Sequence, residues 1–204
     1  MSRMGQGIKK SIGKYLVELL IVAFGVFLGI MVSEGKAKNK VKENTFNSRA
    51  FIIAELETNR QNMAYAVQYH EKLKKGFDSL RTNLPEEIVF SSYFTNNRFR
   101  QEQIPGWNGL GIFKIEDVAF ESAKIGGVFH SMDINDVKQI SSVYRQLNNY
   151  SEFGNMLTQK VISMDAQTTV LDVVGILEML TNDFLNNERH LVTELDKALE
   201  ELKE

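Results

Sequence analysis

Three histidines are the first residues to consider for chemistry, because the chain has no cysteine that could act as a nucleophile or metal ligand. His70, His130 and His190 are far apart, and none has a second ligand at the three- or four-residue spacing of a helical metal site. We therefore expect no metal ion. We also expect His70, beside Glu71, and His190, near Glu194, to be surface residues.

Two other segments resemble functional motifs only in part. Asp133 to Asp136 begins like a calcium loop but lacks its glycine and its later glutamate, so a helix cap at Asp133 or Ser131 is the better interpretation. The glycine-rich run 106–111 (GWNGLG) lacks nucleotide-binding spacing and predicts turns. With no Gly-x-Ser-x-Gly elbow either, we expect no catalytic residue, no cofactor and no enzyme.

The most specific residue pattern in the chain lies in an apolar stretch, Tyr15–Val32, which contains one charged residue. Small residues spaced by four, as in a GxxxG motif, let two helices approach closely in lipid. The predicted helix-association face comprises Glu18, Val22, Gly25, Gly29 and Ser33. Glu18 has two competing interpretations: a helix–helix contact, or an interfacial carboxylate paired with Lys14.

The stretch is long enough to cross a bilayer and exceeds the apolar core of a usual signal peptide. We therefore expect an uncleaved transmembrane helix over 15–33, after a short basic tail over 1–14. Basic residues flank both ends equally, so charge counting alone does not orient the span. The amino terminus adds positive charge and favours a cytoplasmic N-terminus in an inner membrane, with a periplasmic body.

The flanking basic residues predict contact with anionic headgroups, or a solvated stalk next to the membrane. They are Lys9, Lys10, Lys14, Lys36, Lys38, Lys40 and Lys42. After a basic stem over 34–49, the body over 50–204 has 15 basic and 23 acidic residues. An acidic body argues against nucleic acid as a partner and leaves the lipid bilayer and other proteins.

Helical periodicity dominates the body and predicts an all-α fold. From Lys36 to Thr82 the chain favours one long amphipathic helix, ended by Leu84-Pro85. Its predicted apolar face comprises Phe46, Ala50, Ile53, Leu56, Met63, Val67, Leu73, Phe77 and Leu80. An irregular segment over 83–113, with a short hairpin as one interpretation, should follow.

Further helices are predicted over 115–125, from about 134 onward, and over 152–202 with a break near Gly154 or at Met164-Asp165. The first has its apolar face at Val118, Ala119, Ser122 and Ile125. The second has its apolar face at Ile134, Val137, Ile140, Ser141, Tyr144, Leu147 and Tyr150 or Ser151. The third has Leu171, Val174, Leu177, Leu180 or Thr181, Phe184, Leu191, Leu195, Leu199 and Leu202. Long helices around shorter ones predict an antiparallel helical bundle.

The chain resembles a bacterial family of small single-span membrane proteins in which a basic start leads into a span of the type Glu-[Ile/Leu]-x-[Leu/Ile]-Val-x-x-Gly. Here Lys14-Tyr15 precedes such a span from Glu18 to Gly25. A later Ala-Phe-x-x-x-Lys-x-x-Gly pattern is similar to Ala119–Gly127. The Asn-Trp-Asn-Glu that members have after the span is replaced by Ser33-Glu34-Gly35. The resemblance implies a cytoplasmic N-terminus and an extracytoplasmic helical domain, and it implies no activity.

Together these features predict a single-pass membrane protein that acts through protein–protein association, as a scaffold or an accessory subunit of a membrane assembly. The expected partners are copies of itself (a homo-oligomer) or other membrane-protein subunits. The alternative function is an extracytoplasmic ligand-sensing domain on a membrane anchor.

Overall fold

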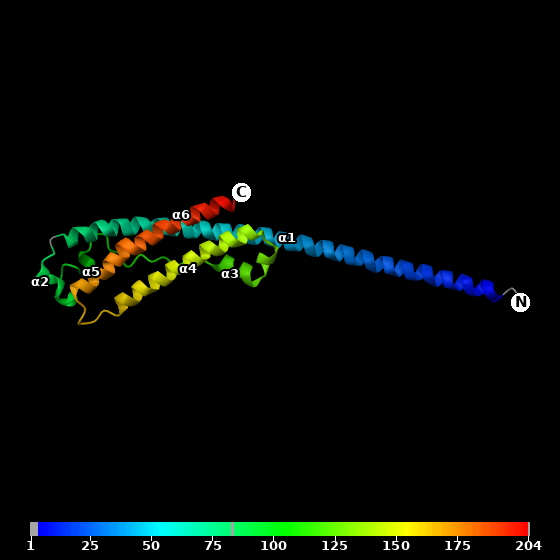
Figure 1. The fold of residues 1–204 in the computed structure, drawn as a ribbon, viewed down its shortest axis with the longest axis horizontal. Helices are drawn as coiled ribbons and strands as arrows, with labels where there is room; N and C mark the ends of the chain where they lie inside the picture. The colour runs from blue at the N-terminus through cyan, green and yellow to red at the C-terminus, as the bar shows by residue number, and fades with distance from the viewer. Residues whose placement is uncertain (1–3, 83, 204) are drawn as a thin grey trace. The chain divides into compact units, whose positions relative to one another are not determined.

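The structure is a computed structural model that describes the backbone of residues 4–82 and 84–203 and, within these ranges, the side chains from residue 18 onward. The chain divides into two compact units, Met1–Asn47 and Ser48–Glu204. Helix α1 (Met4–Arg81) contributes to both units, and every longer element of the described chain is helical (Figure 1). The prediction of an all-α fold is confirmed.

In the first unit, α1 contains the apolar stretch, and its described side chains are exposed. By length and composition this part of the helix could cross a membrane, because an 18-residue window starting within it has a mean hydropathy of 1.8 and no buried residue. A fully exposed apolar helix surface has no favourable place in water. Lipid is the solvent in which such a surface is stable.

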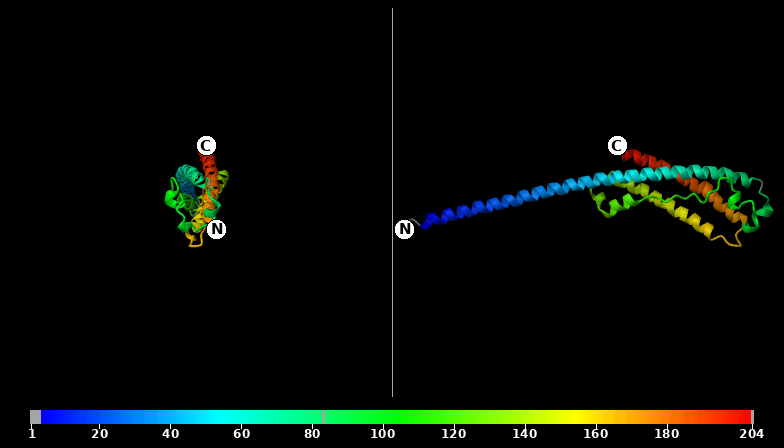
Figure 2. Two further views of the ribbon diagram at one scale, coloured as in Figure 1. Left: turned by 90° about the vertical axis from the view of Figure 1, so that its left-hand side faces the viewer. Right: turned by 180° about the vertical axis from the view of Figure 1, so that it is seen from behind.

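The second unit is a helical bundle made from the later part of α1, α4 (Ile134–Ile162) and a helical run formed by α5 (Val170–Glu178), η4 (Met179–Phe184) and α6 (Leu185–Glu201). Six pairs of side chains join α1 to this run or to the residues just after it. From the first pair to the last, the α1 residue number rises from 57 to 81 while that of its partner falls from 203 to 178. The pairs are Glu57–Lys203, Arg60–Asp196, His70–Glu188, Glu71–Arg189, Lys74–Asn182 and Arg81–Glu178. The first and last long helices of the bundle are therefore antiparallel, as Figure 2 shows in its right-hand view.

Local sequence explains where these helices begin and end. Asp133 caps α4 by accepting a hydrogen bond from the Asn135 amide at 2.8 Å, which confirms one of the two predicted caps. Thr169 and Asp172 form a capping box at the start of α5. Of the two predicted breaks, the one at Met164-Asp165 is correct, because α4 continues through Gly154 to Ile162.

Gly154 is buried because α4 and a neighbouring segment approach closely there: a Cβ atom at this position would lie 2.6 Å from Ile112 Cγ2. The η4 turn is π-helical, and it holds Phe184 in the core against the Tyr150 ring at a centroid distance of 4.8 Å. Such π turns interrupt the regular register of a helix. Here the turn lies between two helices that both supply core residues.

The core of the bundle confirms most of the predicted apolar faces. Its fully buried large side chains include Tyr150, Phe77, Phe99, Phe184, Ile52, Leu56, Met63, Leu73, Ile140, Leu147, Leu157 and Leu180. Leu191, Leu195, Leu199 and Leu202 of the predicted last face are also buried.

Several predicted core positions are wrong. Phe46 and Ala50 are exposed, because the buried face of α1 begins only at Ile52 and is rotated toward Asn59, Ala66 and His70. The other predicted core residues that are exposed lie in the first turn of a helix or on its outer face: Val118, Ser122, Ile125, Ile134, Ser141 and Leu171. Ile53, Val67 and Leu80 lie at the edge of the α1 face and are half-buried.

The region predicted to be irregular contains short helical turns over its described residues, namely α2 (Glu86–Val89), η1 (Tyr93–Thr95) and η2 (Gln101–Gln103). The hairpin interpretation is wrong for residues 84–113, where the only pairing of strand type is an isolated bridge between Ser92 and Thr169. After this region come α3 (Val118–Ile125), which ends at Gly126 as predicted, and η3 (Val128–Ser131).

Leu195→Asp should lower the free energy of unfolding by about 3–5 kcal/mol, because it leaves an unpaired charge in a fully buried position of α6. Leu171→Asp is the matched control, because Leu171 is 47% exposed on α5. Chemical unfolding of both variants, followed by circular dichroism, measures the difference. Equal losses of stability would contradict the core described above.

Candidate functional site

A row of polar side chains on α1 holds the backbone of the segment that leads into α3. Tyr69 donates a hydrogen bond to the Gly109 carbonyl at 2.6 Å, and His70 Nε2 lies 2.8 Å from the Leu110 carbonyl. Asn59 binds both backbone groups of Glu116, accepting from its N–H at 2.9 Å and donating to its carbonyl at 2.7 Å. Buried backbone groups need such partners, so this row fixes the path of the segment.

A fourth residue of the row, Glu55, replaces a missing helix cap. Asp117, at the N-cap of α3, makes no capping hydrogen bond with its side chain. Instead, the Glu55 carboxylate accepts from the Ala119 N–H at 2.6 Å and from the Phe120 N–H at 3.2 Å. A carboxylate at a helix N-terminus is favoured by the unpaired N–H groups and the helix dipole.

These contacts show that the segment over 112–116 is extended, after a turn at Gly111, whose φ is 67°. Asn59 and His70 are separated by about 16.5 Å along α1, at the usual rise per residue. From Leu110 to Glu116 the chain covers this span in six residues, or about 2.8 Å per residue, which is much closer to a strand than to a helix. It runs antiparallel to α1, because Leu110 lies at His70 and Glu116 lies at Asn59.

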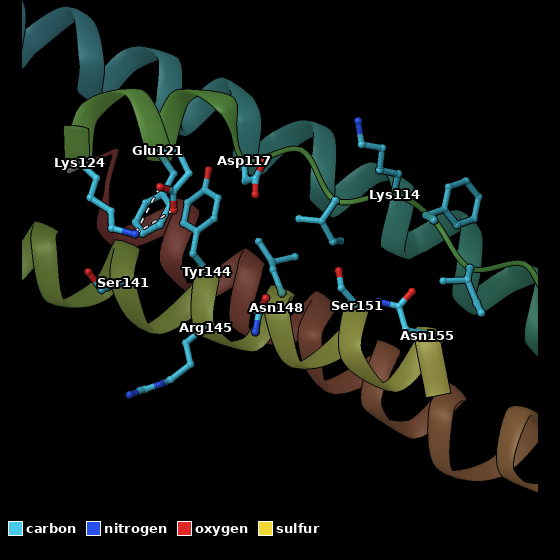
Figure 3. A pocket seen from close by; sticks show the side chains of 15 residues that line it. Lys114, Asp117, Glu121, Lys124, Ser141, Tyr144, Arg145, Asn148, Ser151 and Asn155 are labelled. Atoms are coloured by element: carbon cyan, nitrogen blue, oxygen red, sulfur yellow. Dashed lines mark hydrogen bonds and ion pairs between the residues drawn. The ribbon is translucent and has the colours of Figure 1, made fainter. Parts of the chain in front are cut away.

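A groove of about 680 Å³ lies between this extended segment and α4 (Figure 3). Near one end, Ile112 lies close to Gly154. Toward the other end, the Phe120 ring stacks on the Tyr144 ring at a centroid distance of 4.2 Å. The groove follows α4 from Ser141 to Asn155.

The α4 wall of the groove is mostly polar, with Leu147 as its aliphatic residue. Asn148, Ser151 and Asn155 lie on the side of α4 that faces the extended segment, whereas Ser141 lies at the end near Lys124 (Figure 3). Arg145 lines the rim and turns away from the groove (Figure 3). At the α3 end, Lys124 forms an ion pair with Glu121 at 3.0 Å, so the charges there are balanced. Burial raises the pKa of the Tyr144 hydroxyl, and its hydrogen bond to Glu55 raises it further, so this phenol stays neutral.

A buried His–Glu pair lies behind the segment. His70 Nδ1 is 2.8 Å from Glu188 Oε2, and both side chains are fully buried. The Leu110 carbonyl can only accept, so Nε2 carries a hydrogen, and a second proton must lie between Nδ1 and the carboxyl oxygen. Burial raises the pKa of Glu188, although the neighbouring His70 and the Tyr150 hydroxyl oppose this.

The prediction that His70 is a surface residue is therefore wrong, because its side chain is fully buried. Its ring also packs edge-on against Phe184, at a centroid distance of 5.7 Å. Glu188 Oε1 is the one buried side-chain oxygen or nitrogen of the described residues with no hydrogen-bond partner of good geometry. His190 is exposed, as predicted, and so is His130.

The predicted association face lies on α1 within the first unit. Val22, Gly25, Gly29 and Ser33 are exposed, and a Cβ atom on either glycine would meet no atom of the described chain within 4 Å. Glu18 lies on the same helix and is also exposed. The row is thus open to a second helix, and its use for association stays a prediction.

The predicted membrane-surface residues divide into two groups. Lys36, Lys38, Lys40 and Lys42 are exposed on α1, and alternate positions of a helix point to nearly opposite sides, so they surround the helix instead of forming one patch. The side chains of Lys9, Lys10 and Lys14 lie outside the described residues.

The remaining motifs carry no chemistry that the described residues reveal. Gly106, Gly109 and Gly111 of the glycine-rich run have φ values of 83°, 83° and 67°, which fits the predicted turns. No cluster of three or more His, Asp or Glu side chains that could hold a metal ion occurs in the part of the chain that the structure describes. No protein family, curated protein or solved structure matches this chain.

The groove and the His–Glu pair were both missed by sequence reasoning. The walls of the groove come from segments about 30 residues apart, and nothing in either segment alone indicates the other. A signal for the polar row did exist: Glu55, Asn59, Tyr69 and His70 fall on or beside the apolar face of a helix, where polar side chains need partners.

The protonated pair predicts a pH-dependent stability. An unfolded chain holds one proton on the two side chains between the ordinary pKa values of Glu and His, about 4.3 and 6.5, as the folded pair does. Above about pH 6.5 the unfolded chain loses that proton, whereas the folded pair needs it for the hydrogen bond between His70 Nδ1 and Glu188 Oε2. The free energy of unfolding should then fall by up to about 1.4 kcal/mol per pH unit until the folded pair is deprotonated.

Glu188→Gln should remove this pH dependence, because the glutamine amide can donate to Nδ1 while Nε2–H still donates to Leu110. Melting temperatures of the two proteins between pH 6 and 9 provide the measurement. Parallel curves for wild type and Glu188→Gln would show that the pair does not hold a shared proton.

Proposed function

We propose that the protein is a single-pass, membrane-anchored helical protein that acts through protein–protein association, as a scaffold or an accessory subunit of a membrane assembly. The observation that carries this proposal is the exposed apolar part of α1, whose surface needs lipid or another helix. The family resemblance supports a cytoplasmic N-terminus and a periplasmic bundle at the inner membrane.

A second surface, on the bundle itself, supports association between copies of the chain. The solvent-facing side of α1 follows 3–4 spacing and has no charge over six consecutive positions. We name this the uncharged face of α1; it comprises Phe51, Ala54, Thr58, Gln61, Tyr65 and Gln68, all exposed. Phe51 and Tyr65 are 67% and 62% exposed, and interface cores are poor in charge and rich in aromatic residues.

The chemistry of the uncharged face suits a second copy of the same helix. In a parallel pair related by a two-fold axis, each residue of the seam lies opposite its own copy. Aromatic rings pack on their copies, and the Gln61 and Gln68 amides can donate to and accept from their copies. Lysines or glutamates at these positions would repel each other. Anchoring in one membrane would also raise the effective concentration of the copies.

Gly29→Ile should weaken association of the span at least tenfold, equivalent to about 1.4 kcal/mol, because it adds bulk where two helices would touch. Leu28→Ile is the control, since it changes the neighbouring position at nearly constant volume. A two-hybrid assay in membranes, or cross-linking in mild detergent, compares the variants. The same association for wild type, Gly29→Ile and Leu28→Ile would contradict the role of the glycine row.

One observation favours a second candidate function, the ligand-sensing domain. The groove beside α4 is large enough for a ligand, since typical ligand sites are roughly 300–1,000 Å³.

A further inference from the structure

The extended segment presents unpaired backbone groups to the groove. In an extended chain, successive residues direct their N–H and C=O groups to opposite sides. Leu110 and Glu116 direct theirs to α1, whereas the Phe113 N–H donates to the Tyr150 hydroxyl on α4, at 3.1 Å. Odd-numbered residues of the segment therefore face α4, and Ile115 faces the groove.

The groove-facing backbone groups beyond this contact have no partner in the described part of the chain. They are the Phe113 carbonyl and both the N–H and the carbonyl of Ile115. Across the groove, Ser151 and Asn155 are about 6 Å apart along α4, close to the two-residue repeat of a strand, about 6.6 Å. Both walls thus offer hydrogen-bonding groups to a chain that would lie between them.

We propose that this groove binds an extended segment of a partner protein, which pairs with the backbone at Phe113 and Ile115 as an added strand. An unpaired extended edge is the template for strand addition, in which main-chain hydrogen bonds provide the affinity. Asn148, Ser151 and Asn155 satisfy the other edge of the bound segment. Because Arg145 turns away and the other α4 residues of the groove are uncharged, the residues of the bound segment that face α4 are uncharged.

The length of the groove sets the length of the bound segment. From Ser141 to Asn155 the groove follows α4 for about 21 Å, which admits about six extended residues. This inference rests on the second candidate function, whose ligand it specifies, and it is independent of association between copies through α1.

Selection from a displayed library of random ten-residue peptides, on the full chain in detergent micelles, tests the proposal. Peptides enriched on the wild type should bind at least about tenfold more weakly to Asn148→Trp, whose indole would fill the groove. Asn149→Trp is the matched control, because Asn149 is exposed one position along α4 and does not line the groove. It should bind with nearly wild-type affinity. Unchanged thermal melting of both variants would show that they are folded.

Hydrogen exchange at one amide separates strand addition from other modes of binding. The Ile115 N–H should exchange at least about tenfold more slowly when an enriched peptide is bound, because it becomes a hydrogen-bond donor. The absence of enriched peptides, equal binding to the Asn148→Trp and Asn149→Trp variants, or unchanged exchange at Ile115 would each overturn the proposal. Peptide binding through the groove with no association between copies would support this inference and contradict self-association.

Discussion

The buried face of α1 carries polar groups that cannot stay unpaired, and this constraint organises the bundle. A fully buried imidazole costs free energy unless both ring nitrogens have partners. His70 finds one partner on α6, Glu188, and the other on the segment that leads to α3, Leu110. A single side chain thereby ties three parts of the bundle together. Asn59 and Glu55 extend the same arrangement along α1 and position α3.

The groove is a consequence of this tethering. Because His70 binds the Leu110 carbonyl and Asn59 binds both backbone groups of Glu116, the neighbouring Ile115 backbone is turned toward α4, as the Phe113 N–H is. The segment touches α4 where Gly154 leaves room for Ile112, and beyond that contact the two walls separate. The same extended conformation thus lets α1 hold the segment in the bundle and leaves the backbone groups of the proposed binding edge unpaired. Variants of the polar row would disturb both together.

Sequence reasoning succeeded where the signal was local. The 3.6-residue period correctly predicted the helices and the buried leucines of α6, and the residue type at Asp133 correctly predicted a helix cap. Each of these features depends on residues within a few turns of the chain. The prediction failed at His70 because histidine was treated as a polar surface residue. Its burial depends on a hydrogen bond to Glu188, 118 positions away in the sequence. The groove was invisible for the same reason, since its walls meet only in the folded bundle. The row of small residues Gly25, Gly29 and Ser33 could be recognised because their spacing by four is a property of one helix and can be counted in the sequence.

The central claim is that copies of this protein lie in one membrane and associate through α1. Because the chain has no cysteine, Tyr65→Cys introduces a single thiol on the uncharged face, and Glu152→Cys introduces one at an exposed position of α4. Oxidation of membranes washed at alkaline pH, followed by gel electrophoresis, measures both membrane retention and pairing. The account predicts that both variants stay in the membrane pellet and that the Tyr65→Cys protein forms a disulfide-linked dimer at least about tenfold faster. Loss of the protein to the wash, or equal dimer formation by the two variants, would contradict it.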